Sequence, residues 1–186
     1  MSNKIILIVG ESGSGKDTLV NAVCKKYGYT KVKSYTTRPQ RKDFKDKQSH
    51  IFVTDEEFDN LKNLVAYTEF NGFKYCATAE QVEQADFYII DCEGIKYFKE
   101  HYKGNKEIVA VHISCPEVDR FLRMKGRESI EKALERIKWD KHAFKEVSKL
   151  TNITIDNPNT ADRKNEAGVE MLHNIVEGEV LLNESD

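Results

Sequence analysis

The chain has 186 residues, enough for one domain with a sizeable core. Its 39% hydrophobic and 32% charged residues are typical of a soluble globular protein, and its formal net charge of -2 does not favour binding to nucleic acid. No apolar run approaches the roughly 20 residues that cross a bilayer, and the apolar stretch near the N-terminus is too short for a signal peptide. The four cysteines form no C-x-x-C pair, so we expect reduced thiols in a cytoplasmic protein without a membrane partner.

The first predicted element is a buried strand over residues 5–9, with the sequence IILIV. It leads into GESGSGK at residues 10–16, which matches the pattern G-x-x-x-x-G-K, and residues 16–27 have the apolar spacing of a helix. In this context backbone N–H groups surround phosphate oxygens, and Lys16 can bridge the β- and γ-phosphates of ATP. An ordinary glycine-rich turn is the alternative, but it does not account for the lysine or for the strand and helix on either side.

Asp17 stands where such loops usually carry a Ser or Thr that binds magnesium. Two interpretations stay open: an acid in the first helical turn stabilises the helix dipole, or its carboxylate holds Mg²⁺ through water. Thr18 supplies the next hydroxyl and is a candidate phosphate contact. The predicted ATP-binding residues are therefore Gly10, Glu11, Ser12, Gly13, Ser14, Gly15, Lys16, Asp17 and Thr18.

A second phosphate site is predicted in the polar, basic segment SYTTRPQR, which places Arg38 and Arg41 around Pro39. Two guanidinium groups on a short loop can bind one phosphate through forked hydrogen bonds. A solvated basic loop is the alternative. Tyr75, which lies in a following hairpin, can add a hydroxyl to this site.

The same region contains three further predicted elements. A short strand covers residues 51–53, and Thr54 with Glu57 predicts the capping box of a helix. A β-hairpin follows over residues 64–78, with its turn at Asn71-Gly72.

Beyond the hairpin, buried strands are predicted at residues 87–91, 108–114 and 152–156, and a last helix at 160–176. Asp91 ends its strand at the carboxyl edge, where open α/β sheets bind ligands. It is a candidate for magnesium or for the acceptor, and a buried structural acid is the alternative.

The highly charged helical segment between Pro116 and Val147 is predicted to contain a lid. A closing lid can deliver cations to a transferring phosphoryl group while it expels water. A solvated helix face is the alternative. The candidate cations are Arg120, Arg123, Lys125, Arg127 and Arg136.

The alternation of buried strands and helices predicts a parallel α/β sheet. The hairpin region and the basic helical region interrupt this alternation and are predicted to be two mobile inserts on one domain. The predicted parts are a core at 1–33, 84–115 and 139–176, an acceptor-binding insert at 34–83, a lid at 116–138 and a tail at 177–186.

Taken in order, these features resemble the guanylate kinase family over roughly residues 4–176. The resemblance rests on GESGSGK, SYTTR, DCEG at 91–94, and the residues Ser34, Arg38, Arg41, Tyr75, Arg123, Arg127 and Arg136. It implies the P-loop NTPase fold, a three-layer α/β/α arrangement with ATP and Mg²⁺ as cofactors. It also implies a catalytic set of Lys16, Arg123, Arg127 and Arg136, an acceptor site of Ser34, Arg38, Arg41, His50, Tyr75 and Asp91, and metal binding by Asp17 and Asp91.

The chain departs from the family pattern at the positions that read guanine. The usual Glu at the start of the hairpin strand is Ala66, and the usual Ser or Thr two residues after the phosphate-binding Tyr is Ala77. The usual Tyr before the FV strand is His50. Glu69 lies three residues along its strand from Ala66 and is expected to face the other side. A site that loses its hydrogen bonds to a base loses much of its discrimination.

Ribose 1,5-bisphosphate kinases of the same superfamily are also similar, in SGSGKD, in the HI of SHIFVTDEEF and in GRE at 126–128. Asp17 is expected in that group. Other relatives are non-catalytic interaction modules, which tend to lose the loop lysine that this chain keeps.

The leading hypothesis is a cytoplasmic kinase that transfers the γ-phosphoryl group of ATP to a nucleoside monophosphate, either GMP or a deoxynucleotide. The alternative acceptor is ribose 1,5-bisphosphate, which would give 5-phosphoribosyl diphosphate. A nucleotide-binding regulatory protein without turnover is the third hypothesis. A monomer or a homodimer is expected, with no nucleic-acid partner.

Overall fold

The computed structural model describes residues 2–40, 49–159 and 165–179. Its core is a parallel sheet in the order β6-β1-β7-β8. The predicted strands at 5–9, 108–114 and 152–156 are confirmed, whereas the strand predicted at 87–91 ends two residues early. The bounds are β1 (Lys4–Val9), β6 (Phe87–Ile89), β7 (Glu107–Ser114) and β8 (Ile153–Asp156).

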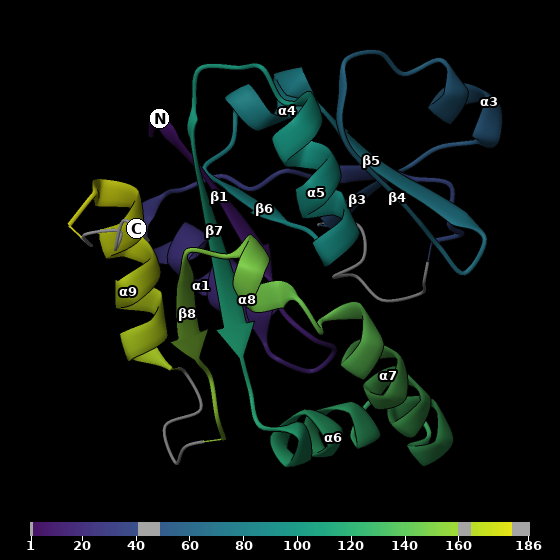
Figure 1. Ribbon diagram of the computed structural model, residues 1–186, viewed down its shortest axis with the longest axis vertical. Helices are drawn as coiled ribbons and strands as arrows, with labels where there is room; N and C mark the ends of the chain where they lie inside the picture. The colour runs from purple at the N-terminus through teal and green to yellow at the C-terminus, as the bar shows by residue number, and fades with distance from the viewer. Residues whose placement is uncertain (1, 41–48, 160–164, 180–186) are drawn as a thin grey trace.

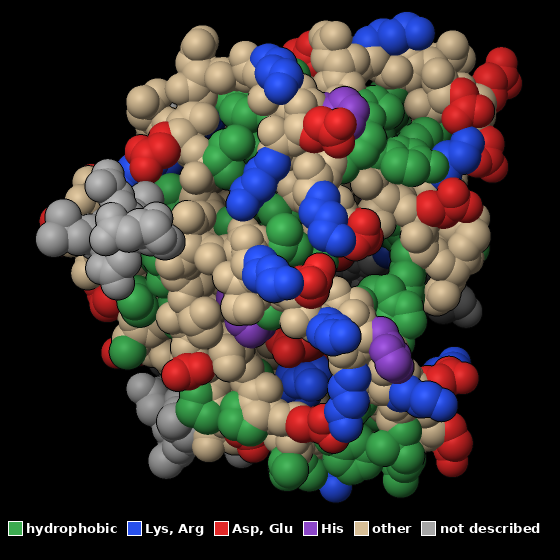
Figure 2. All heavy atoms as spheres, viewed as in Figure 1, with side chains coloured by type: hydrophobic (Ala, Val, Ile, Leu, Met, Phe, Trp, Pro, Cys, Tyr) green, Lys and Arg blue, Asp and Glu red, His purple; other side chains and the backbone are tan. Residues whose placement is uncertain are grey.

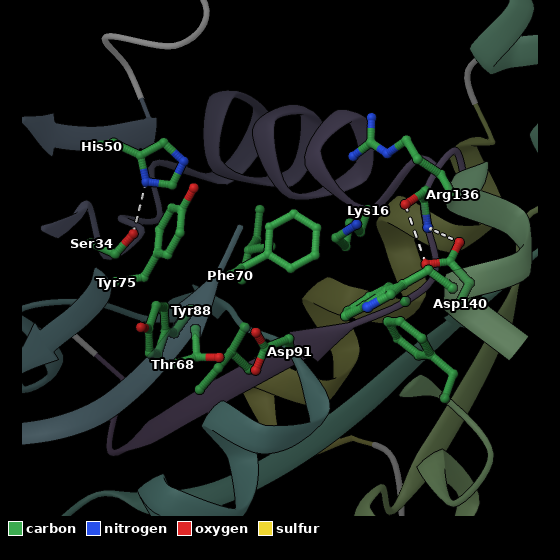
Figure 3. Close-up of a pocket in the computed structure, with 16 residues that line it drawn as sticks. Lys16, Ser34, His50, Thr68, Phe70, Tyr75, Tyr88, Asp91, Arg136 and Asp140 are labelled. Atoms are coloured by element: carbon green, nitrogen blue, oxygen red, sulfur yellow. Dashed lines mark hydrogen bonds between the residues drawn. The ribbon is translucent and has the colours of Figure 1, made fainter. Parts of the chain in front are cut away.

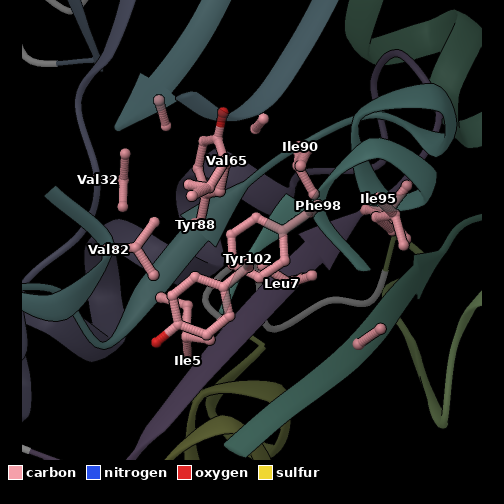
Figure 4. Close-up of a cluster of buried hydrophobic side chains, with 14 of the residues drawn as sticks. Ile5, Leu7, Val32, Val65, Val82, Tyr88, Ile90, Ile95, Phe98 and Tyr102 are labelled. Atoms are coloured by element: carbon pink, nitrogen blue, oxygen red, sulfur yellow. The ribbon is translucent and has the colours of Figure 1, made fainter. Parts of the chain in front are cut away.

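Both faces of this sheet are buried, which explains why its strands are continuous apolar runs. Successive side chains of a strand point to opposite faces. Ile5, Leu7 and Val9 therefore join one hydrophobic cluster, and Ile6 and Ile8 join another. Figure 4 shows the first cluster, in which aromatic rings from β6 and α5 pack beside the side chains of β1.

Helices cover the two faces of the sheet and form the outer layers of a three-layer arrangement (Figure 1). Leu19, Val20 and Leu172 pack on one face, and Ile95 and Phe98 pack on the other. The predicted helix over 16–27 is confirmed. The helices of the first face are α1 (Lys16–Tyr27) and α9 (Glu166–Glu177), and those of the second are α5 (Cys92–His101) and α8 (Val147–Leu150).

A second, smaller sheet has the order β3-β2-β5-β4 and carries the predicted hairpin. Asn71 and Gly72 both have positive φ, 52° and 74°, as the predicted tight turn requires. The capping box of Thr54 and Glu57 is present at the start of α3. The elements of this region are β2 (Ser34–Thr36), β3 (His50–Phe52), α3 (Asp55–Asp59), β4 (Leu64–Phe70), β5 (Phe73–Thr78) and α4 (Ala79–Glu83).

The basic segment folds as two helices, α6 (Glu117–Lys125) and α7 (Ile130–Ala143), which bury Met124, Ala133 and Ile137 between them. Helix α6 ends at Lys125, and Gly126 forms its C-terminal cap before α7 begins. The first residues of the predicted helix 160–176 lie outside the described part, and α9 begins after Asn165, which caps it.

The surface shown in Figure 2 carries Lys and Arg side chains interspersed with acidic ones over α5, α7 and α8. Exposed ion pairs account for part of this pattern, for example Lys96 with Glu93 and Lys149 with Glu146. Over the described residues, the helices are all too short or too polar to cross a membrane.

Candidate active site

The site lies at the carboxyl edge of the parallel sheet, where ligands bind in open α/β folds. Four segments meet there because parallel strands all end on the same side. They are the glycine-rich loop after β1, Asp91 after β6, the start of α6 after β7, and Asn157 after β8.

The glycine-rich loop has the backbone that a phosphate cradle needs. Gly13 and Gly15 have φ of 79° and 87°, a left-handed region that side chains rarely adopt. A Cβ on Gly15 would lie 2.5 Å from Nδ2 of Asn157, and one on Gly13 would lie 2.8 Å from the backbone oxygen of Arg120. The loop then enters α1, whose N-terminus adds positive potential.

The outer side of this loop is held by side chains from distant elements. Arg123 donates to the carbonyl oxygens of Gly13 and Ser14 at 3.1 and 3.0 Å and to that of Asn157 at 2.9 Å. The side-chain amide of Asn157 donates to the Ser14 carbonyl at 2.7 Å. These hydrogen bonds satisfy the carbonyl oxygens of Gly13 and Ser14 in the loop. The catalytic role predicted for Arg123 stays a prediction, since the structure places its guanidinium on the loop itself.

A buried ion pair links helix α7 to the same loop. Asp140 accepts from the backbone N–H of Ser12 at 2.9 Å and from its hydroxyl at 3.3 Å. Arg120 donates to Asp140 at 2.9 Å, and their side chains are only 6% and 1% exposed. Burial raises the pKa of Asp140, although the Ser12 N–H and the charge of Arg120 oppose this shift.

A second pair lies at the start of the loop. His112 on β7 and Glu11 approach to 3.1 Å between Nε2 and Oε2. Burial favours a higher pKa for Glu11, but the hydrogen bond with His112 and the positive charges of His112 and Arg120 bring the pKa below its ordinary value.

One cavity of about 310 Å³ extends from the loop to the second sheet. Lys16 lies at one end, and Figure 3 shows Ser34, His50 and Tyr75 at the other, with Phe70 between them. The cavity is lined by Gly10, Ser12, Lys16, Ser34, His50, Thr68, Phe70, Tyr75, Tyr88, Ile89, Ile90, Asp91, Arg136, Trp139, Asp140 and Phe144.

The predicted acceptor residues come together because β2, β3 and β5 are neighbours. Ser34 lies opposite His50, and its hydroxyl is 2.9 Å from Nδ1 of that histidine. The ring of Tyr75 meets the ring of His50 edge-on at 5.9 Å. The guanidinium of Arg38 lies 5.5 Å from the ring centre of Phe52 and donates to the Pro39 carbonyl. Arg41 lies outside the described residues, so its predicted role stays a prediction.

The two alanines at the guanine-reading positions lie directly opposite each other on β4 and β5. Ala66 is 1% exposed and Ala77 is fully buried, and both belong to the core cluster that contains Tyr88 and Ile90. Glu69 is exposed and does not line the cavity, as the alternation along β4 predicts.

The remaining predicted residues differ in how they relate to the cavity. Asp91 lines it, and its Oδ1 also accepts from the Gly94 N–H at 2.6 Å and so caps α5. Arg136 lines the cavity with its guanidinium 3.4 Å from both oxygens of Glu128. Arg127, in the turn after α6, donates from Nε to the Arg123 carbonyl at 3.1 Å. Asp17 is exposed in the first turn of α1.

Several lining residues were not among the predicted site residues. Thr68, Phe70 and Tyr88 come from β4 and β6, and Trp139 and Phe144 come from the end of the lid region. Their types are common in hydrophobic cores, so the sequence alone contains no signal for them. The rule that placed Asp91 at a strand end also applies to Asn157, which follows β8 directly.

The model of the guanylate kinase family matches residues 2–171. The chain belongs to the guanylate kinase family. It is 28% identical over 159 residues to the guanylate kinase of Clostridium acetobutylicum, and the matched region covers 80% of this chain and 75% of that protein. It is 26% identical over 186 residues to the guanylate kinase of Clostridium tetani, and this matched region covers 94% of this chain and 86% of that protein.

The fold is also that of a solved family member. The crystal structure of guanylate kinase from Anaplasma phagocytophilum superposes with a TM-score of 0.63 and 23% identity, over 96% of this chain and 87% of that one. The predicted P-loop NTPase fold and the predicted membership of a nucleoside monophosphate kinase family are therefore confirmed.

Proposed function

We propose that this protein transfers the γ-phosphoryl group of ATP to a nucleoside monophosphate, with GMP as the first acceptor to test. One observation carries the proposal. Lys16 and the glycine-rich loop line the same cavity as Ser34 and Tyr75, so donor and acceptor would meet in one cavity. Holding two reactants at close range in the right geometry removes much of the entropic part of the barrier.

On the donor side, the loop backbone and Lys16 would bind the phosphates of ATP. Arg136 is the lid arginine that lines the cavity, so we assign it to the charge that develops on the transferring group. Arg123 supports this arrangement from behind the loop through its bonds to the loop carbonyls.

On the acceptor side, Ser34, His50 and Tyr75 would orient the acceptor phosphate, and Arg38 lies on the adjoining loop. No covalent intermediate is needed, because the bound phosphate oxygen would attack the γ-phosphorus in line. Closure of α6 and α7 over the cavity would exclude water.

The residues present also suit magnesium. Among the described residues, no group of three or more His, Cys, Asp and Glu could enclose a metal ion. Mg²⁺ in kinases is instead usually held by one or two carboxylates, water and substrate phosphates. Asp91 in the cavity and Asp17 in the first turn of α1 can supply those carboxylates. When bound, the ion would neutralise charge on the phosphates.

The test is ADP release from Mg-ATP with GMP as acceptor. Lys16→Ala is expected to lower kcat about 10²- to 10³-fold, as loss of one transition-state donor does. Lys25→Ala is the matched control, because Lys25 lies on the same helix but is exposed and outside the cavity. Turnover with ribose 1,5-bisphosphate but with no nucleotide would replace the proposed acceptor. Binding of ATP without turnover of any acceptor would support a regulatory protein instead.

A further inference from the structure

The polar groups at the acceptor end of the cavity share one chemical property. We use "acceptor end" for Ser34, His50, Thr68, Tyr75 and Tyr88, which line the cavity from β2, β3, β4, β5 and β6. Four of them are hydroxyls and one is an imidazole. A hydroxyl both donates and accepts, and a neutral imidazole has one nitrogen of each kind. Ser34, His50 and Tyr75 are assigned to the acceptor phosphate, so the hydroxyls of Thr68 and Tyr88 remain for the base. Both hydroxyls can adapt to either a donor or an acceptor edge of a base.

Two carboxylates line the cavity, and each has another role. Asp140 is engaged by Ser12 and Arg120 at the loop end. Asp91 caps α5 through Oδ1 and is the carboxylate assigned to magnesium in the proposed function. No other carboxylate, and no Asn or Gln side chain, lines the cavity over the described residues. A fixed acceptor dedicated to the donor edge of guanine is therefore missing from the described lining.

The rest of the wall is apolar. Phe70 from the hairpin and Trp139 from α7 meet edge-on, with ring centres 5.0 Å apart, and Ile90 and Phe144 line the cavity with them. Every base has a flat π-face, so aromatic and aliphatic contact gives affinity with little dependence on the base. Ala66 and Ala77 contribute no polar atom and are buried in the core.

We infer that the acceptor end binds nucleoside monophosphates without selecting one base, so that the kcat/KM values for purine and pyrimidine nucleotides lie within about 10²-fold of one another. The inference rests on the proposed function. Its physical reason is the difference between two kinds of site. A pocket that hydrogen-bonds one substrate rejects an analogue about 10⁴- to 10⁵-fold, whereas apolar contact separates substrates only about 10- to 200-fold.

The test measures kcat/KM of the full chain with Mg-ATP and each of GMP, dGMP, AMP, CMP and dTMP. All five values are expected to lie within about 10²-fold of one another. A preference for GMP of more than about 10³-fold over every other base would overturn the inference and leave the proposed function standing. Turnover with none of the five would overturn the proposed function, and the inference with it.

Substitutions at Thr68 provide a second, independent measurement. Thr68→Val removes a hydroxyl at nearly constant volume, and it is expected to lower kcat/KM for all bases together, with the GMP to AMP ratio changed less than about threefold. Thr68→Glu introduces an acceptor-only carboxylate, and it is expected to raise that ratio about tenfold or more. A change of the ratio beyond tenfold in Thr68→Val would show that Thr68 already selects a base, and would overturn the inference.

Discussion

Replacing Asp140 with alanine removes the carboxylate that links helix α7 to the glycine-rich loop. Among the described residues, Asp140 is the carboxylate within hydrogen-bond distance of Arg120, so the Arg120 side chain, which is 6% exposed, would be left buried without it. Its Nε is already buried without a partner among the described residues, and its remaining contact is a 3.4 Å bond from Nη1 to the Ser12 carbonyl. The Ser12 N–H would lose its acceptor as well.

The expected loss follows from the burial of this pair. Removing one member of a buried ion pair leaves an uncompensated charge and costs about 3–5 kcal/mol. Replacing both members with apolar residues of similar size is often close to neutral. Asp140→Ala is therefore expected to lower the free energy of unfolding by about 3–5 kcal/mol, and Arg120→Met with Asp140→Leu is expected to recover most of that loss.

Urea unfolding followed by circular dichroism measures this difference, and α7 offers a matched control one residue away. Lys141 pairs with Glu117 on α6, but their side chains are 60% and 48% exposed. Lys141→Ala should therefore cost about 0–1 kcal/mol. The reasoning fails if Asp140→Ala costs no more than Lys141→Ala. It also fails if the double apolar variant is as unstable as Asp140→Ala, because the loss would then come from packing and not from the uncompensated charge.

Three further predictions concern the loop and the cavity. Gly15→Ala should lower the free energy of unfolding and kcat/KM more than Gly28→Ala does. Both glycines have positive φ, but a Cβ on Gly15 would meet neighbouring atoms and one on Gly28 would not. Equal losses in the two variants would refute a role for this steric clash. His112 lowers the pKa of Glu11 below 4.5 in the folded protein, so Glu11 stabilises the fold above that pH and the contribution is lost as the pH falls through the lowered pKa. Glu11→Gln should accordingly destabilise the protein at about pH 6, and this loss should shrink progressively as the pH falls below 4.5, which urea midpoints along that pH range will show. The single tryptophan, Trp139, lines the cavity and is 46% exposed, so binding of ATP should change its fluorescence in a saturable way. An unchanged spectrum in the wild type would contradict the cavity as the ATP-binding site. An equal response in Lys16→Ala at the same ATP concentrations would contradict it too.

Much of the core was predictable because its signals are local. A strand buried on both faces is a continuous apolar run, and a phosphate loop is a fixed pattern between a strand and a helix. Each signal lies within a few neighbouring residues, and the structure confirms strand β1 and helix α1 on either side of the glycine-rich loop. The turn at Asn71-Gly72 and the cap at Thr54 are local for the same reason.

The elements that were missed depend on contacts between distant residues. Strand β2 is three residues long, in a polar segment before Pro39, and it exists because β3 and β5 pair with both of its edges. Helix α4 has only five residues and little periodic signal of its own. Helix α5 is the exception among the missed elements, because Cys92, Ile95 and Phe98 have helical spacing in the sequence.

The sequence by itself determined the family, the phosphate loop and the residue types at the acceptor site, because each is a pattern of neighbouring residues. Only the tertiary structure decided what those residues contact. It placed Arg123 on the carbonyls of the loop, made Asp140 the partner of Ser12, and lined the acceptor end with hydroxyls and apolar side chains. The physical reason is that burial and hydrogen-bond partners come from segments far apart in the chain, which spacing along one segment does not record.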